Sequence, residues 1–260
     1  MKRHIRHIAL AALALGSTLH AQTIYDGFAT GTAAGQYPPG DNASVAVGSG
    51  TGWSQASWVD SAPRKFLAVA DGLTYSDGTN ELATTNGAVH SPNAEGNAEL
   101  ERDFQTFGAG NEVWFSVLMH RKPAAHGFED RFAFQLRSQT GGLKYSIRAL
   151  DGSKEWHASY VPQGSNNEVT AALPGAAYDE PVFIVGRIST IGSPSASFSV
   201  WVNPGNLKEL GEPAWTSPGF HAQGIGRVSL VTDGTREGLF DEIRIGTTQE
   251  DVVPLKGGAQ

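Results

Sequence analysis

Residues 131–148 read RFAFQLRSQTGGLKYSIR, and this stretch decides the fold class. Apolar and polar residues alternate over 131–137 and again over 143–148. This period of two is the signal of a half-buried strand. The link at 138–142, Ser-Gln-Thr-Gly-Gly, is typical of a hairpin turn. The stretch therefore predicts a pair of neighbouring strands, each with one face buried.

Strand signals recur along most of the chain. Residues 113–119 are apolar on both faces, as a central strand would be, and further strands are predicted at 154–161, 182–189, 196–203, 226–232 and 239–246. Glycine is abundant, with 32 residues, and charged residues make up only 17%, against a usual level of about 25%. Short strands joined by glycine-rich turns predict an all-β fold of two packed antiparallel sheets, a sandwich or jelly roll.

The start of the chain predicts export. Lys2, Arg3 and Arg6 precede an apolar run at 8–15, and Ala21 supplies a small residue after it. A basic start, an apolar middle and a small residue at the end make a secretory signal peptide. We therefore expect a cleaved signal peptide over 1–21 and a secreted or periplasmic protein.

The composition of the chain excludes several classes of protein and of site. We expect one sandwich domain over 22–255 and a short tail over 256–260. Cysteine is absent, which excludes disulfides, thiolate metal sites and a lipoprotein anchor. No later run approaches the 18 apolar residues of a membrane span. The net charge of −7 for the full sequence argues against nucleic-acid binding.

Several segments carry a resemblance to one family. They are Tyr25-Asp26-Gly27-Phe28, Gly50-Thr51-Gly52-Trp53-Ser54 followed by Trp58, Trp114-Phe115-Ser116, Val200-Trp201-Val202-Asn203-Pro204 and the stretch 240–248. Together they resemble secreted bacterial proteins with a concanavalin A-like (LamG-like) sandwich, which are mostly of unknown function. The last segment is similar to the closing strand of many LamG-like domains. The resemblance implies a lectin/glucanase-type jelly roll, and a fold does not fix a function.

Three carboxylates alternate in the middle of the chain. Glu99, Glu101 and Asp103 would share one face of a strand, with about 6.6 Å between successive positions. Concanavalin A-like glycosidases place acidic residues on one strand face in a similar way, and this spacing is compatible with a glycosidase pair. The order differs from the Glu-Ile-Asp-x-x-Glu type of signature. A solvated edge strand is the simpler interpretation, and we assign no catalytic residue.

Asp241 is a candidate metal ligand. It has the same parity as Leu239, Ile243 and Ile245, so it is expected to point toward their apolar side. The resemblance implies that the aspartate of this closing strand binds a structural calcium together with groups from the N-terminus. Asp26 lies in the matching N-terminal segment, and calcium takes carboxylate and carbonyl oxygens. The alternative is an aspartate held by backbone N–H groups.

The outward face of the strands between 131 and 160 is a candidate sugar site. Arg137, Lys144, Arg148 and His157 are expected to point away from the core. An arginine fork fits a carboxylate or sulfate group with two hydrogen bonds. Trp201 is out of phase with its apolar neighbours, and its indole would stack on a sugar ring. The alternative is an ordinary solvated sheet face and a tryptophan covered by a loop.

These patterns favour a non-catalytic carbohydrate-binding or cell-surface module whose partner is an extracellular polysaccharide. A structural or matrix protein without a ligand is the second interpretation. A glycoside hydrolase or polysaccharide lyase is the enzyme alternative. It is less favoured because the sequence holds no recognisable acid–base pair.

Overall fold

The computed structural model describes residues 23–45, 49–62, 65–91, 96–122, 131–140, 142–150, 155–177, 179–233 and 237–257. The predicted signal peptide at 1–21 lies outside the described residues, as does the end of the predicted tail at 258–260. Among the described residues, no helix is long and apolar enough to cross a membrane.

One sheet has eight strands. Its order is β13-β12-β11-β6-β15-β4-β3, and β1 pairs with β15 beside this path. The strands are β1 (Ile24–Asp26), β3 (Leu67–Val69), β4 (Ala88–Ser91), β6 (Val113–Arg121), β11 (Val182–Ile188), β12 (Phe198–Val202), β13 (Trp215–Thr216) and β15 (Gly238–Gly246).

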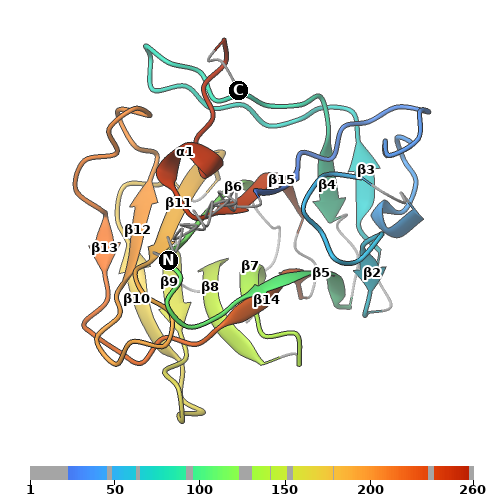
Figure 1. The fold of residues 1–260 in the computed structure, drawn as a ribbon. Coiled ribbons are helices and arrows are strands. Elements are labelled where there is room, and N and C mark those ends of the chain that lie inside the picture. The colour runs from blue at the N-terminus through green and yellow to red at the C-terminus, as the bar shows by residue number, and fades with distance from the viewer. Residues whose placement is uncertain are drawn as a thin grey trace, which may run out of the picture.

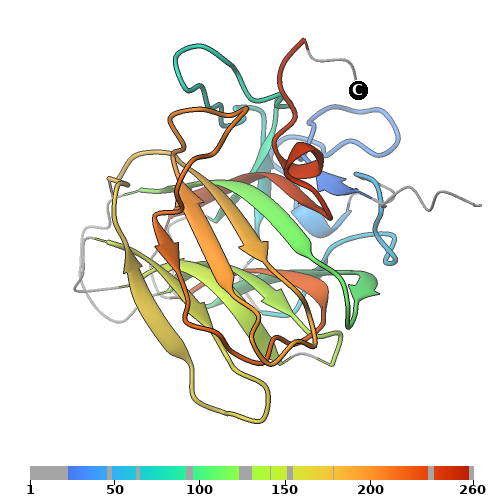
Figure 2. The ribbon, with the colours of Figure 1, turned by 60° about the vertical axis from the view of Figure 1, so that its left-hand side comes forward.

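The other sheet has seven strands in the order β10-β9-β8-β7-β14-β5-β2. The strands are β2 (Val59–Asp60), β5 (Ala98–Phe107), β7 (Phe132–Arg137), β8 (Leu143–Ala149), β9 (Trp156–Tyr160), β10 (Val169–Leu173) and β14 (Ile225–Thr232). A 3-10 turn, η1 (Ala43–Val45), and one short helix, α1 (Gln249–Val252), complete the elements. The two sheets lie face to face in Figure 1 and are seen from another side in Figure 2. The predicted antiparallel sandwich is confirmed.

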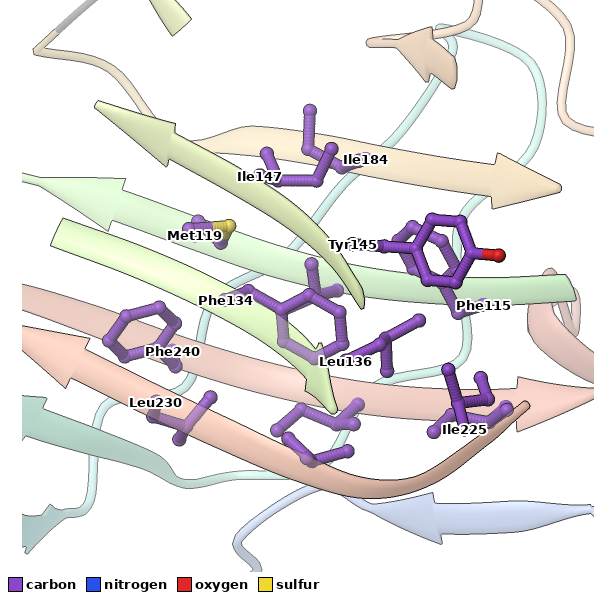
Figure 3. Close-up of a cluster of buried hydrophobic side chains, with 14 of the residues drawn as sticks. Phe115, Met119, Phe134, Leu136, Tyr145, Ile147, Ile184, Ile225, Leu230 and Phe240 are labelled. Atoms are coloured by element: carbon purple, nitrogen blue, oxygen red, sulfur yellow. The ribbon is translucent and has the colours of Figure 1, made fainter. Parts of the chain in front are cut away.

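The main core lies between the sheets. Figure 3 shows Phe134 of β7 and Ile147 of β8, from the predicted hairpin, in a cluster with Met119 of β6. Phe132 stacks on Phe240 of the opposite sheet, with ring centres 4.3 Å apart. Because every second residue of β7 and β8 is large and apolar, one face of these strands enters the core and the other is left for polar groups.

A second apolar cluster covers the outer face of the eight-stranded sheet. It contains Leu118 of β6, Phe183 of β11 and Trp201 of β12, packed against Leu207 and Val252 from covering segments. Strands β6 and β11 are apolar on both faces, so both faces need cover. The prediction of a central strand at 113–119 is confirmed.

The closing strand β15 contains a bulge, which leaves Asp241 on the side of Leu239, as expected, and places it opposite to the side of Ile243 and Ile245. Its pairing with β6 shifts between Asp241 and Arg244, and Glu242 has a φ of 52° in the left-handed region. Phe240 and Ile243 therefore both enter the core between the sheets, although they are an odd number of positions, three, apart. Asp241 pairs opposite Leu118 and faces the outer apolar cluster. The expected side of Asp241 rests on the alternation of an unbroken strand. A bulge inserts an extra residue, so the residues on either side of it no longer alternate in the same way.

Candidate functional site

The outer face of the seven-stranded sheet is almost entirely polar, and we call it the polar face. It consists of the outward residues of β5, β14, β7, β8, β9 and β10. They are Glu99, Glu101, Asp103, Ala133, Gln135, Arg137, Lys144, Ser146, Arg148, His157, Ser159, Thr170, Ala172, Arg227, Ser229 and Val231.

A row of small polar side chains crosses the middle of this face. The strand pairings align Glu101, Ser229, Gln135, Ser146, Ser159 and Thr170 in one line. Neighbouring strands lie about 4.7–4.9 Å apart, so the row offers a polar group at each such step. Its four central members, from Ser229 to Ser159, are buried.

Two arginines bind three carboxylates at one end of the row. Arg137 Nη1 donates to Glu99 Oε1 at 2.5 Å and to Glu101 Oε1 at 2.9 Å. Arg227 donates to Asp103 through Nε at 2.5 Å and Nη2 at 3.2 Å, and to Glu101 through Nη1 at 3.3 Å. The hydrogen bonds to Asp103 raise the pKa of Arg227 above its usual value. Both arginines at this end of the polar face are therefore neutralised by carboxylates of the protein, and one negative charge is left over.

A second ion pair lies at the other end. Arg148 Nη1 is 2.9 Å from Glu168 Oε2, and its Nη2 donates to Thr170 Oγ1 at 2.9 Å. Ser159 Oγ donates to the other oxygen of Glu168. Within the described part of the chain, Arg148 Nε and Ser146 Oγ are buried without a hydrogen-bond partner. These two polar atoms therefore have unused hydrogen-bonding capacity.

Lys144 stands at the rim of the polar face. Its Nζ donates to Gln223 Oε1 at 2.5 Å, and burial lowers the pKa of this lysine. It borders an open cleft of about 410 Å³ with Ser138, Thr140 and Gln163. Lys144 is therefore placed to contact a ligand that extends past the end of the row.

The structure brings together four of the five predicted sugar-binding residues. Arg137, Lys144, Arg148 and His157 all lie on the polar face, where His157 pairs opposite Arg148.

Trp201 lies elsewhere, on the outer face of the other sheet. Its ring stacks on Trp114 at 5.5 Å between centres, its Nε1 donates to Gly211 O at 2.9 Å, and only 7% of the residue is exposed. The alternative of a tryptophan covered by a loop is the one that the structure shows. Trp201 lies on the opposite face of β12 from Phe198 and Val200, and both faces of this strand are covered by apolar groups. It therefore cannot stack on a sugar held at the polar face.

The acidic half of the polar face was not predicted as part of a binding site. Glu99, Glu101 and Asp103 were interpreted as part of an edge strand, but β5 pairs with β14 over most of its length and with β2 on its other side. The signal was present, because these carboxylates alternate with the buried residues Leu100 and Arg102.

Glu168 and Arg227 gave no local signal, since only the pairing of distant strands brings them to this face. The predicted basic face is therefore balanced in charge. Its basic residues are Arg137, Lys144, Arg148 and Arg227, and its acidic residues are Glu99, Glu101, Asp103 and Glu168.

Hydrogen-bond donors of the protein surround the Asp26 carboxylate, at the positions where a bound metal ion would lie. Its Oδ2 accepts from Arg102 Nη1 at 2.9 Å, from Tyr37 Oη at 2.6 Å and from Trp58 Nε1 at 3.0 Å. Its Oδ1 accepts from Phe28 N at 3.0 Å. The buried Arg102 guanidinium supplies the countercharge that a buried carboxylate requires.

Asp241 faces away from Asp26. Asp26 pairs opposite Ile243 on the core side of the eight-stranded sheet, whereas Asp241 lies on its outer side. Asp241 accepts from Leu73 N and Glu242 N, each at 2.7 Å, and burial raises its pKa well above the usual value.

No group of three or more metal-ligating side chains occurs among the described residues, and calcium needs 6–8 oxygens. The two aspartates do not fit one calcium site. The predicted calcium site at Asp26 and Asp241 is tested by the melting experiment given in the Discussion.

The comparisons with known proteins concern the fold. No family model matches the chain, and no curated protein matches it. The endo-β-1,4-glucuronan lyase of the fungus Trichoderma reesei is similar with a TM-score of 0.56 and 15% identity, over 78% of this chain and 94% of the lyase.

Two further solved structures are similar at lower scores. A carbohydrate esterase of the Shiga toxin-encoding bacteriophage phi24B gives a TM-score of 0.47 and 14% identity, over 74% of this chain and 91% of the esterase. The galectin LEC-6 of Caenorhabditis elegans gives 0.36 and 14%, over 54% of this chain and 89% of the galectin. The similarity to the lyase supports the predicted jelly-roll sandwich.

Proposed function

We propose that this protein is a secreted, non-catalytic carbohydrate-binding module that holds a neutral, hydroxyl-rich polysaccharide on its polar face. The row from Glu101 to Thr170 carries the proposal. Carboxylate, amide and hydroxyl groups follow one another across the strands. Amide and hydroxyl groups both donate to and accept from sugar hydroxyls, and a carboxylate accepts from them. The unsatisfied atoms Ser146 Oγ and Arg148 Nε lie within or beside this row.

The ion pairs favour a neutral ligand over an acidic one. Arg137, Arg148 and Arg227 each bind a carboxylate of the protein. A sulfate or uronic acid group would have to displace that partner, which leaves a carboxylate unpaired. Sugar hydroxyls can instead bind beside the intact ion pairs. His157 is the aromatic ring available on this face for contact with the C–H groups of a sugar.

The enzyme alternative rests on the convergence of Glu99, Glu101 and Asp103 on one face. Glycoside hydrolysis requires a protonated carboxyl group near the glycosidic oxygen. Both oxygens of Glu101 and both oxygens of Asp103 accept hydrogen bonds from arginine, so neither group is arranged to donate a proton. This arrangement favours binding over catalysis.

The proposal is tested by binding of the mature chain, residues 22–260, to insoluble neutral glucans, xylans and mannans and to acidic polysaccharides. Ser146→Ala and Gln135→Ala each remove a side chain from the row and are expected to weaken binding about fivefold, the equivalent of one hydrogen bond of about 1 kcal/mol. Ser199→Ala is the matched control, because Ser199 faces outward on β12 of the other sheet.

Each outcome bears on the proposal. Absence of binding to every neutral polysaccharide would leave the interpretation as a structural protein. Binding only to acidic polysaccharides, with a steep loss of affinity in high salt, would contradict the proposed neutral ligand and show that the arginines and Lys144 bind anionic groups. Release of reducing ends or unsaturated sugars from a bound polysaccharide would show an enzyme. The intact mass of exported protein, expected to begin at Gln22, tests secretion separately.

A further inference from the structure

A cleft of about 910 Å³ lies on the opposite side of the molecule from the polar face, and we call it the Arg244 cleft. It is bordered by β1, β15, α1 and the segment 83–85. Figures 1 and 2 both place β1, β15 and α1 beside one another. Its lining is more apolar than polar, and the polar side chains among the lining residues include Thr23, Thr51, Thr84, Thr85, Tyr25 and Gln249.

A buried cluster holds Arg244 in place at this cleft. Arg244 Nη2 donates to Glu242 Oε2 and to Ala83 O, each at 2.5 Å. Its guanidinium lies 4.7 Å from the centre of the Tyr25 ring, and Tyr25 Oη donates to Glu242 Oε2 at 3.1 Å. Thr85 N donates to the other oxygen of Glu242. Arg244 is therefore positioned by an ion pair, a carbonyl and an aromatic ring.

The backbone is strained to build this cluster. Glu242 adopts a φ of 52°, and a non-glycine residue in the left-handed region costs about 1–3 kcal/mol. Gly27 packs against the same groups, since a Cβ there would lie 2.2 Å from Tyr25 Oη and 2.9 Å from Glu242 Oε1. Strain of this kind persists where the surroundings hold it, and it clusters at binding and catalytic sites.

One donor of the cluster is unused. Arg244 Nη1 is buried without a hydrogen-bond partner among the described residues, and only 6% of the side chain is exposed. A buried donor without an acceptor costs about 1–3 kcal/mol. Arg244 is among the residues that line the cleft, so the cleft is where an acceptor for this donor is to be sought.

The lining indicates the chemical class of the ligand. Arg244 is paired with Glu242, and Lys208 lies among lining residues that include Glu250 and Asp251, so the excess is a single negative charge. An extended peptide would need a free strand edge, but the backbone of Tyr25 is already bonded to Thr51 in both directions. Ala83 N likewise donates to Pro254 O. Side-chain hydroxyls beside an apolar rim favour a ligand with hydroxyl groups and C–H faces.

We propose that the Arg244 cleft is a second binding site that takes a short, uncharged oligosaccharide, with Arg244 Nη1 donating to one of its oxygens. Glu242 and Tyr25 are positioning residues, because they act through Arg244. The site is separate from the polar face, so each can fail without the other.

The experiment is a titration of the 15N-labelled mature protein with neutral tri- to hexasaccharides of glucose, xylose and mannose at millimolar concentration. Amide shifts are expected at Thr51, Thr84 and Gln249. Arg244→Lys keeps the positive charge and removes the guanidinium group. The dissociation constant for the oligosaccharide is therefore expected to rise about tenfold, equivalent to about 1.4 kcal/mol. Thr84→Val keeps the shape and removes one hydroxyl, with a rise of about fivefold, as for one hydrogen bond.

Thr190→Val is the matched control, because Thr190 is exposed and lies outside the cleft. Thr84→Val keeps the test valid if Arg244→Lys fails to fold. The proposal is overturned if no oligosaccharide shifts the cleft amides, or if Thr84→Val and Thr190→Val bind alike. It is also overturned if the cleft takes peptides and not saccharides. Loss of oligosaccharide binding in Ser146→Ala alone would assign the binding to the polar face.

Discussion

The outer faces of the two sheets differ in polarity and in whether other segments cover them. The eight-stranded sheet presents Leu118, Phe183 and Trp201, and loops and α1 cover them. The seven-stranded sheet presents a polar row and ion pairs, with Ser146 and Gln135 at its centre. The first face is a second core, whereas the second is a surface built from hydrogen-bonding groups.

The difference shows how one sandwich provides two kinds of site. An uncovered apolar face would form an exposed patch, so strands that are apolar on both sides require covering segments. Those segments leave the Arg244 cleft beside α1. The alternating strands of the other sheet need no cover, so their polar residues are placed by the pleat of the sheet itself.

The largest expected effect separates the two faces by stability. Trp201→Ala removes a ring that stacks on Trp114 in the covered face, and truncation of a buried tryptophan costs about 3–5 kcal/mol. Ser146→Ala on the polar face removes an unpartnered hydroxyl and is expected to change stability by less than about 0.5 kcal/mol. Urea unfolding of both variants checks this. Equal losses would show that the polar face is also a structural core.

The next prediction compares two ion pairs that involve β5, one on its buried side and one on its outer side. Arg102 points inward to Asp26, with 2% of its side chain exposed, whereas Arg227 pairs outward with Asp103 at 22%. Loss of one partner from a buried ion pair costs about 3–5 kcal/mol, and we expect Arg102→Met to lie near the lower end because methionine fills part of the space. Arg227→Met is expected to cost about 1 kcal/mol or less. Denaturant unfolding distinguishes them, and a reversed order would contradict the assignment of the two sides.

A pH effect is expected where a covering loop meets the eight-stranded sheet. Hydrogen bonds from Asn80, Leu207 N and Thr79 N hold the pKa of Asp77 well below its usual value. The unfolded chain therefore takes up the proton first, and the stabilisation is present above about pH 3.9. It is lost as the pH falls through the lowered folded pKa.

The wild type should lose its stability advantage over Asp77→Asn as the pH drops from about 5 to 2. Thermal melting across this range measures it. Asp71→Asn, at an exposed aspartate, serves as the control. A constant difference between wild type and Asp77→Asn at all pH values would refute the role of the Asp77 charge.

The smallest effect is expected from calcium. Because Asp26 is neutralised by Arg102 and lies on the opposite side of the sheet from Asp241, the melting temperature should be the same in chelator and in millimolar calcium. A rise with calcium that disappears in Asp241→Asn would restore the predicted site. Mass spectrometry under native conditions provides an independent count of bound ions.

Much of the fold could be predicted because strand signals are local. Alternation in 131–137 and 143–148 fixed the two strands, the turn between them and the side of each residue. It also placed Arg148 and His157 on the same outer face. The bulge at Glu242 could not be predicted, because the left-handed backbone is held there by Thr85, Tyr25 and Arg244 from other segments or positions.

The sequence by itself determined that the chain forms half-buried strands and which side chains of each strand share a face, since this depends on a period of two residues. The tertiary structure decided which strands became neighbours. Glu99 and Arg137, 38 positions apart, meet across β14, and Arg102 and Asp26, 76 apart, meet inside the sandwich. No local pattern encodes these pairs. They follow from the packing of the sheets, which turned a predicted basic face into a neutral one and gave Asp26 an arginine partner.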